Sequence, residues 1–499
     1  MSKPSVCIPN TNVSTMNFIR IPVKRASSLA TATCVLVFTA SAETPETARQ
    51  IAAGRMPERW VYESPYSVTD SVSSMWWKSF NDPVLDSLIA TGRANNYDIA
   101  AAIKRMAVAK AQTGIARAGY YPTAGISAGW TKERASGMTT SHTAPATSDS
   151  YFNIGADVSW EIDVFGKVRA GVNEKKASWR ASRAEYEGVM LSVSAEIATT
   201  YIDYRVAQTQ LAIAKSHSES QLKIVKIAEA RHETGLASAL DVAQARTVYS
   251  STLSTIPPLE SQIHTLRNSL ALLLAEYASE LPASLDSAQV LPFCPAVPAA
   301  GVPGDLMRRR PDIIAAEQNL AAAAAALGLA KKEFLPTLSI RGNIGTASHR
   351  ADNLFSKESL TYSIEPTLSW TLFSGFSRKY AVAEARAQME ELIASYHSTV
   401  QTAVSEVDNA IYSYARSLET ITALEEALAQ SHRAYTKAVD LYKSGNSGFT
   451  NVADAQMSYL TYSNQLIAAK GTAITSLITL YKALGGGTDT AGTPVSYYE

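Results

Sequence analysis

Residues 152–163 have the sequence FNIGADVSWEID, in which apolar and polar side chains alternate at every position. An alternation of period two places the apolar side chains on one face of a β-strand and the polar ones on the other. Residues 362–372, YSIEPTLSWTL, repeat the pattern, and Trp160 and Trp370 lie 210 positions apart. With two weaker alternating segments, this predicts strands near 121–131, 151–164, 336–346 and 362–373.

Other pairs of similar segments lie at nearly the same offset as the two tryptophans over most of the chain. The chain is therefore internally duplicated. Residues 114–123, GIARAGYYPT, match residues 328–337, GLAKKEFLPT. A nearly constant offset indicates one structural unit used twice. The sequence thus predicts a first repeat over 43–281 and a second over 304–487. A Pro/Ala-rich linker, 282–303, joins them, a tail covers 488–499, and 43–75 is predicted to be irregular.

Very long helices are predicted in each repeat. No proline occurs from Lys167 to Glu233 or from Arg378 to Ser444, and each stretch would be roughly 100 Å long as a helix. Their small side chains suit the wall of a tube better than the core of a solid bundle. Pro257-Pro258 is expected to break or kink its helix. Shorter helices are predicted over 84–118, 240–255, 259–276, 305–333 and 451–484.

The N-terminus is typical of an export signal. Lys24 and Arg25 precede an apolar stretch that ends in Ala40-Ser41-Ala42, the small-residue pattern that signal peptidase requires. A signal peptide is therefore predicted over residues 1–42. The chain has 45 basic and 45 acidic residues, which gives no sign of a nucleic-acid-binding surface. Three cysteines, at 7, 34 and 294, fit neither a metal site nor a disulfide framework.

The four predicted strands could belong to a membrane-spanning barrel or to a soluble sandwich, and their number helps to decide between these two architectures. Each segment has about the ten residues that a tilted strand needs to cross a bilayer, although a soluble sandwich strand alternates in the same way. Four strands cannot close a barrel, and open edges are not stable in hydrocarbon. Several copies must then share one barrel: two would give eight strands and a filled interior, and three would give twelve and a lumen. Pro366 is expected near a membrane interface or at a bulge, and no helix is expected to span the membrane.

Four ordered motifs also carry a family resemblance: WWKSFNDPVLD at 76–86, residues 114–123, RRPDI at 309–313 and YKALGG at 481–486. From about residue 60 to 487 the chain resembles the TolC-like outer membrane efflux proteins, most closely the NodT/OprM-type branch. The resemblance implies a mixed α/β membrane protein with a 12-stranded β-barrel, formed by three protomers with four strands each. A long periplasmic α-helical barrel continues it.

The resemblance also implies a place and partners. The protein would lie in the outer membrane of a Gram-negative bacterium, among outer membrane lipids, and extend into the periplasm. As a homotrimer it would meet a periplasmic adaptor and an inner-membrane pump, as the exit duct of a tripartite efflux or type I secretion system. Many relatives carry a lipid on a cysteine that ends the signal. Here Val35-Leu36-Val37-Phe38 continues the apolar core past Cys34, so no N-terminal lipid is predicted.

The resemblance places a periplasmic aperture at the turns between long and short helices, where Asp241, Tyr442, Asn451 and Asp454 match gating positions. A ring of Asp454 carboxylates would favour cations, and Asn451, where the family has an acid, would weaken that preference. Both aspartates could instead serve a helix N-terminus. Gly235 and Gly445 are predicted to end the long helices. The apolar strand face predicted to meet lipid includes Phe152, Ile154, Val158, Trp160, Ile364, Leu368 and Trp370.

Catalytic motifs are absent from the sequence, so neither an enzyme, a cofactor nor a metal site is predicted. The Arg308-Arg309-Arg310 run is expected to pair with acids rather than bind a ligand. The alternative to a channel is a structural periplasmic coiled-coil protein without channel activity. It explains the helices and the signal, but not two apolar-faced strand pairs in duplicate.

Overall fold

The computed structural model describes residues 45–61, 67–69, 74–134, 148–286, 291–292, 297–298 and 303–486. All of them belong to the compact unit Glu43–Glu499. The predicted signal peptide 1–42, the cysteines and the predicted tail 488–499 lie outside the described residues.

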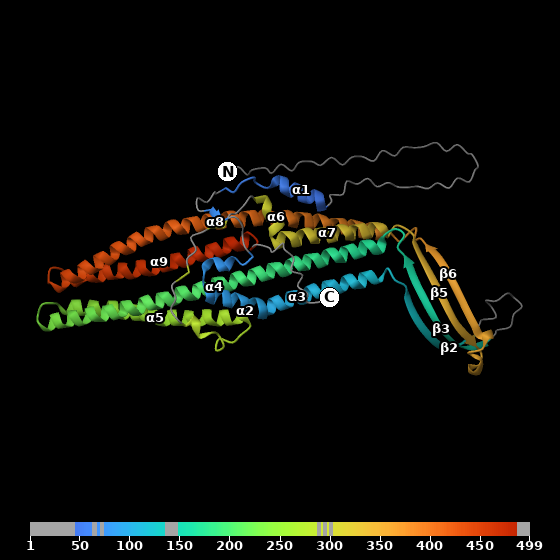
Figure 1. Ribbon diagram of the computed structural model, residues 1–499, viewed down its shortest axis with the longest axis horizontal. Coiled ribbons are helices and arrows are strands. Elements are labelled where there is room, and N and C mark those ends of the chain that lie inside the picture. The colour runs from blue at the N-terminus through green and yellow to red at the C-terminus, as the bar shows by residue number, and fades with distance from the viewer. Residues whose placement is uncertain are drawn as a thin grey trace, which may run out of the picture. The chain divides into compact units, whose positions relative to one another are not determined.

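One antiparallel sheet has the order β2-β3-β5-β6 (Figure 1). Its strands are β2 Thr123–Arg134, β3 Ser148–Ile162, β5 Thr337–Ser348 and β6 Leu360–Ser369. The β3–β5 pairing joins the two repeats. Three predicted ends are wrong: β2 and β3 extend further towards their connection, and β6 stops four residues earlier than expected. At the ends of β2 and β3, backbone pairing continues through polar residues, which a hydrophobic pattern cannot detect.

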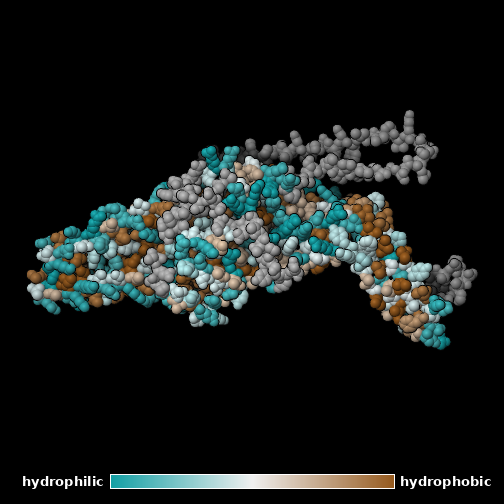
Figure 2. Space-filling model, in the orientation of Figure 1, coloured by the Kyte–Doolittle hydropathy of each residue, from teal (hydrophilic) through white to brown (hydrophobic). Residues whose placement is uncertain are grey.

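The register puts all the alternating apolar residues on one face of this sheet. Trp130 lies opposite Phe152, which in turn lies opposite Ser348, and Ile344 lies opposite Tyr362. Many large apolar side chains on this face are exposed, among them Ile126, Ile344 and Leu368, and hydrophobic residues gather over the sheet in Figure 2. Pro366 pairs with Ile340 in unbroken register. The bulge considered for it is therefore wrong, and it lies in an edge strand of the protomer's sheet, where proline is tolerated.

Two helices of 67 residues run the length of the helical part: α4, Lys167–Glu233, and α8, Ser377–Lys443. Both lie within one residue of the predicted bounds. Helix α5, Ala239–Leu274, turns back along α4, and α9, Phe449–Ala483, turns back along α8 (Figure 1). Nearer the sheet, α3, Tyr97–Ala118, packs on α4, and α7, Pro311–Lys332, contacts both α4 and α8.

The predicted break at Pro257-Pro258 is wrong, because α5 runs through both prolines. Each proline removes one backbone N–H donor, which leaves the carbonyls of Leu253 and Ser254 without their helical partners. Both prolines are exposed, so water can hydrogen-bond to those carbonyls. The cost of the missing bonds is thereby reduced, and packing of α5 along α4 keeps the helix continuous.

Two helices predicted as single are each divided in two. The stretch 84–118 consists of α2, Pro83–Asn95, and α3, with Asn96 between them; its side chain accepts the N–H groups of Asp98 and Ile99 and donates to the carbonyl of Leu273. The stretch 305–333 breaks at Arg310, whose backbone is extended before Pro311, as a residue preceding proline prefers.

Segments predicted to be irregular contain short elements. Helix α1, Pro45–Arg55, lies within 43–75, and strand β1, Ser67–Thr69, pairs in parallel with β4, Val297–Pro298, from the linker. The sequence did not predict these elements, because their residues are polar or rich in proline and show no hydrophobic period. The remaining elements are η1 Trp76–Phe80, η2 Ala283–Leu285, η3 Pro303–Asp305, α6 Leu306–Arg309, η4 Ala351–Asn353 and η5 Lys357–Ser359.

The two repeats share one bond where strand meets helix. The indole N–H of Trp160 donates to the carbonyl of Tyr120 at 3.1 Å, and that of Trp370 donates to the carbonyl of Phe334 at 2.9 Å. Tyr120 and Phe334 are matched residues of the duplication. The repeat is therefore structural, and each tryptophan fastens its end of the sheet to the helix that enters it.

Candidate functional site at the helical turns

Two tight turns join the long helices to their partners, α4 to α5 and α8 to α9. Gly235 and Gly445 have φ angles of +73° and +78°, which glycine adopts without strain. The N–H of Gly235 donates to the carbonyl of His232 at 2.9 Å, and that of Leu236 donates to Arg231 at 2.7 Å. The Gly445 turn repeats both bonds. Each glycine thus closes a Schellman motif that ends a long helix.

Asp241 has a local structural role. The hydroxyl of Ser238 accepts the backbone N–H of Asp241 at 3.2 Å, and the Asp241 carboxylate accepts the N–H of Ser238 at 3.4 Å. This is a reciprocal capping box at the start of α5. The helix-terminus role considered from the sequence is therefore present at Asp241.

Tyr442 is the most enclosed of the predicted aperture residues, with 2% of its surface exposed. Its ring packs edge-on against Phe449 at 5.6 Å, and the Arg231 guanidinium lies 5.0 Å from its centre. Its hydroxyl has no hydrogen-bond partner among the described residues. Burial raises the pKa of Tyr442, and the nearby negative charge of Asp241 raises it further. Asp241 and Tyr442 thus come from different hairpins and interact electrostatically.

Arg231, which the sequence reasoning missed, connects the two hairpins. Its guanidinium donates to the carbonyl of Lys443 at 2.9 Å, at the end of α8, and to the carbonyl of Leu236 at 3.3 Å, in its own turn. It also covers the Tyr442 ring. The available signal was a cation in the last turn of a helix, where it can bind terminal carbonyls.

Asn451 and Asp454 lie on α9, apart from these contacts. The Asn451 amide donates to the Ser447 hydroxyl at 2.8 Å, within its own turn. Asp454 is exposed and lies beyond the first turn of α9, where the helix dipole has little effect. The helix-terminus alternative therefore fits Asp241 and not Asp454. Within the described ranges, no hydrogen bond or ion pair joins Asp454 to Tyr442 or Asp241.

The turns rest on a small hydrophobic core of their own, separate from the larger core that includes Trp76, Tyr201 and Leu477. It consists of Ile224, Val225, Ala228, Ala245, Ala438, Val439, Tyr442, Phe449 and Val452. Residues from α4, α5, α8 and α9 all contribute. The ends of the two hairpins therefore share one core, to which both contribute.

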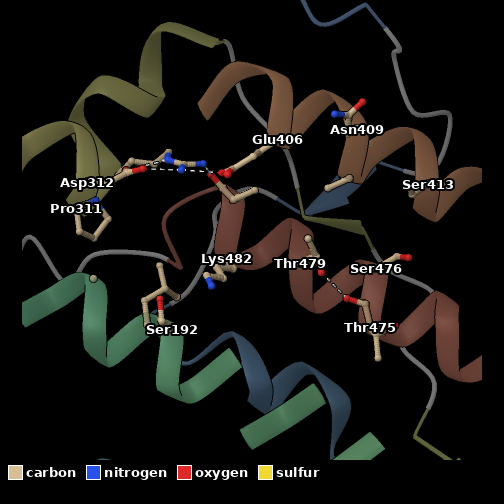
Figure 3. Close-up of a pocket in the computed structure, with 15 residues that line it drawn as sticks. Ser192, Pro311, Asp312, Glu406, Asn409, Ser413, Thr475, Ser476, Thr479 and Lys482 are labelled. Carbon is tan, nitrogen blue, oxygen red and sulfur yellow. Dashed lines mark hydrogen bonds and ion pairs between the residues drawn. The ribbon is translucent and has the colours of Figure 1, made fainter. Parts of the chain in front are cut away.

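A second polar site lies where α7 begins and α9 ends (Figure 3). The buried Arg310 guanidinium bonds to both carboxylate oxygens of Asp312, at 3.0 and 2.6 Å, to Glu406 at 2.8 Å and to the carbonyl of Ala483 at 3.0 Å. Pairing with acids, as predicted for the arginine run, is confirmed at Arg310. The open cavity beside it, about 690 Å³, is lined by polar residues that include Ser192, Asn409, Ser413, Thr475, Ser476, Thr479 and Lys482.

A buried hydrogen-bond network holds α2 and the linker against α4. The Tyr201 hydroxyl donates to the Asp82 carboxylate at 2.6 Å and accepts from Arg205 at 3.1 Å. Asp82 also caps α2, and Arg205 donates to the carbonyl of Leu285 at 3.0 Å. Burial raises the pKa of Tyr201 well above its ordinary value, and the bond to Asp82 adds to this. Every partner is satisfied, so the role is structural.

The sheet supplies the other candidate surface, with opposite chemistry on its two faces. On the apolar face Ile364 is 74% exposed and Leu368 67%. Trp370 is exposed too, but it lies just beyond the end of β6. On the polar face the register gives five acids and one base, Glu133, Asp149, Asp157, Glu161, Glu365 and Arg341. An exposed apolar face backed by a charged one fits a strand set between lipid and water.

Comparison with known proteins decides the family. The model of the outer membrane efflux protein family matches residues 88–276 and 302–486. The chain belongs to the outer membrane efflux protein family. It is 30% identical over 424 residues to the probable efflux pump outer membrane protein SepC of Pseudomonas putida, covering 85% of this chain and 87% of SepC.

A second relative and a solved structure agree with this assignment. The pyoverdine export outer membrane protein OpmQ of Pseudomonas putida is 30% identical over 417 residues, which cover 83% of this chain and 88% of OpmQ. The structure of the outer-membrane channel OprN superposes with a TM-score of 0.81 at 28% identity, covering 87% of this chain and 98% of OprN.

The chain is thus an outer membrane efflux channel, the exit duct of a tripartite efflux pump, with a β-barrel in the outer membrane and a helical barrel that extends into the periplasm. The family is one of transport channels and not of enzymes. The structural coiled-coil alternative is wrong. In the part of the chain that the structure describes, no group of three or more His, Cys, Asp or Glu residues is placed to hold a metal ion.

Helix α7 is long and apolar enough to cross a membrane by length and composition, the one such helix among the described residues. It packs along α4 and α8, and its Leu320 and Leu327 are buried against Met389 and Ile393 of α8. Helix α7 therefore packs within the helical part of the protomer.

Proposed function

We propose that the channel is a homotrimer whose twelve strands close one barrel. The open edges of the four-stranded sheet carry this proposal. Strands β2 and β6 each have a neighbour on one side only, while the apolar face around them is exposed. Unpaired backbone groups are not stable in hydrocarbon. Pairing β2 of one copy with β6 of the next satisfies both edges, and three copies leave a lumen.

The partners in this proposal are a periplasmic adaptor and an inner-membrane pump. SepC is named as an efflux pump outer membrane protein, and the sequence contains no P-loop motif for nucleotide binding. The described helices instead present exposed hairpin ends, with Leu236 and Leu240 among the exposed apolar residues there. Energy would come from the pump, and the adaptor would act on the hairpin ends.

Closure of the duct depends, in this proposal, on the aperture residues Asp241, Tyr442, Asn451 and Asp454. Tyr442 and Arg231 join the two hairpins of a protomer, so separating the hairpins must break their contacts. The exposed Asp454 carboxylates of three copies would form a ring that attracts cations and repels anions. Asn451, an amide, adds no charge to that ring.

Two measurements test these proposals separately. Native mass spectrometry of the detergent-extracted protein should give three copies; a monomer or dimer as the main species would contradict the trimer. Single-channel recording in planar bilayers should give a small, cation-preferring conductance. Replacing Asp454 with asparagine should lower the cation-to-anion permeability ratio severalfold.

Glu419 provides the matched control for that recording. It is an exposed acid on α8, paired with Arg416 and far from the turns. A Glu419→Gln variant removes the same charge and should leave the ratio unchanged. Equal ratios in Asp454→Asn and the parent protein would remove Asp454 from the aperture without affecting the trimer assignment.

A further inference from the structure

The acidic residues of the sheet all lie on one of its two faces. All five acids, together with Arg341, lie on the polar face that lines the lumen. Only two charged residues of the described strands fall on the lipid-facing side: Lys132 and Arg134, both on β2. Their neighbours in sequence and in register, Glu133 and Asp149, lie on the opposite face. The lipid-facing side thus carries positive charge alone.

These two bases occupy one particular level of the sheet. Along the lipid-facing side of β2 the residues from Ala124 to Trp130 are small or apolar, and Lys132 and Arg134 follow directly. Trp130 is exposed, as expected of an aromatic at a membrane–water boundary. The change from apolar to basic occurs at the end of the sheet away from the helices, where Figure 2 shows hydrophilic residues. The helices extend into the periplasm, so this end meets the outer leaflet.

Within one protomer, the surroundings leave both cations available. Across the pairing, Lys132 faces Ser150 and Arg134 faces Ser148. Both side chains are exposed, and neither has a carboxylate partner within the described ranges. Residues 135–147, which follow Arg134 in the sequence, include no acid. Two positive charges at the level of the lipid headgroups, with no acid beside them in the protomer, attract an anionic lipid headgroup.

We propose that Lys132 and Arg134 bind the phosphate groups of outer-leaflet glycolipid, the lipid A part of lipopolysaccharide. Two bases spaced two residues apart on one strand lie about 7 Å from each other, suitable for one phosphorylated headgroup above Trp130. Arginine offers a planar fork and lysine a point charge to phosphate oxygens. The proposal depends on the outer membrane position of the sheet and not on the gating proposal.

The test compares the glycolipid retained by purified channel. The full-length protein and a Lys132→Gln/Arg134→Gln variant are extracted in detergent and incubated with bisphosphorylated lipid A or with phosphate-free lipid A. Bound lipid per protein is measured by native mass spectrometry. Each basic residue near an anionic headgroup contributes about fivefold in affinity. The double variant should therefore bind bisphosphorylated lipid A on the order of twentyfold more weakly.

Arg341→Gln is the matched control, because it removes a strand arginine from the lumen face. It should bind lipid A as the parent protein does. Equal binding by the double variant and the parent, or equal binding of phosphate-free and bisphosphorylated lipid A by the parent, would overturn the proposal. A variant that fails to fold is recognised by loss of the parent's oligomeric mass. Single Lys132→Gln and Arg134→Gln variants then replace it, with about fivefold weaker binding expected of each.

Discussion

Replacing Arg231 with glutamine should open the periplasmic end of the resting channel. The change removes the bond from α4 to the Lys443 carbonyl of α8, and the cation above the Tyr442 ring. A charged hydrogen bond contributes about 1.5–3 kcal/mol, and an exposed cation–π contact about 0.5–1 kcal/mol. Solvent reaches the partly exposed Arg231 side chain and weakens these contacts. We therefore expect Arg231→Gln to destabilise the closed state by about 2 kcal/mol per protomer.

The assay is single-channel conductance in planar bilayers. A loss of about 2 kcal/mol shifts the ratio of closed to separated hairpins roughly 30-fold in each protomer. Arg231→Gln channels should therefore open more often and show a larger mean conductance. Arg231→Lys should fall between, because lysine keeps the charge but cannot reach two carbonyls with a planar fork.

Arg246→Gln is the control for Arg231→Gln. Arg246 bonds to Glu229 at 2.7 Å, in the same region, but both residues belong to the α4–α5 hairpin. Removing this bond leaves the two hairpins joined to each other, so the conductance should not change. If Arg231→Gln and Arg246→Gln gave the same conductance as the parent, the contact between hairpins would have no part in closure.

Three further predictions concern stability, each measured by thermal unfolding of the detergent-extracted protein. Tyr201→Phe leaves the buried Asp82 carboxylate without its hydroxyl donor and should cost about 2–3 kcal/mol; an unchanged melting temperature would contradict the network. Burial lowers the pKa of His217 in the folded protein. Below about pH 6.5, His217 of the unfolded chain therefore binds a proton more readily than His217 of the folded protein. Stability should then fall as pH drops from about 7 to 5, and His217→Gln should flatten that fall. Gly485 has φ +86°, and an added Cβ would lie 2.7 Å from the Arg309 carbonyl oxygen. Gly485→Ala should therefore lower the free energy of unfolding by at least about 2 kcal/mol. A smaller loss would show that the backbone there can shift.

The elements set by a strong periodic pattern were predictable from the sequence. The long helices lack proline and end at Gly235 and Gly445, so both their existence and their ends could be inferred. Strand ends were less certain, because pairing between Lys132 and Ser150 depends on the partner strand and not on hydrophobicity. The continuity of α5 through Pro257 depends on packing against α4, which no local rule includes.

The candidate site was predictable only in part, for a similar reason. Motif positions led to Tyr442 and Asp241, which come from different hairpins, and the negative charge of Asp241 raises the pKa of Tyr442. Arg231 has no motif, and its role follows from the meeting of two hairpins more than 200 residues apart in sequence. The charge sorting on the sheet also needed the register, since alternation within one strand does not reveal which neighbours share its face.

The junctions that Trp160 and Trp370 fasten have a consequence for circumference. Each strand continues into one helix, β2 from α3, β3 into α4, β5 from α7 and β6 into α8, so a closed ring contains as many helices as strands. Neighbouring strands lie about 4.8 Å apart and packed helices about 8–10 Å. Strand tilt of about 45° widens the strand spacing to roughly 7 Å around the ring. The remaining difference between strand spacing and helix spacing must be taken up at the junctions. There Gly166, Gly375 and even Phe376 have positive φ angles. Those few residues are where the chain must splay outward from a narrow ring to a wide one.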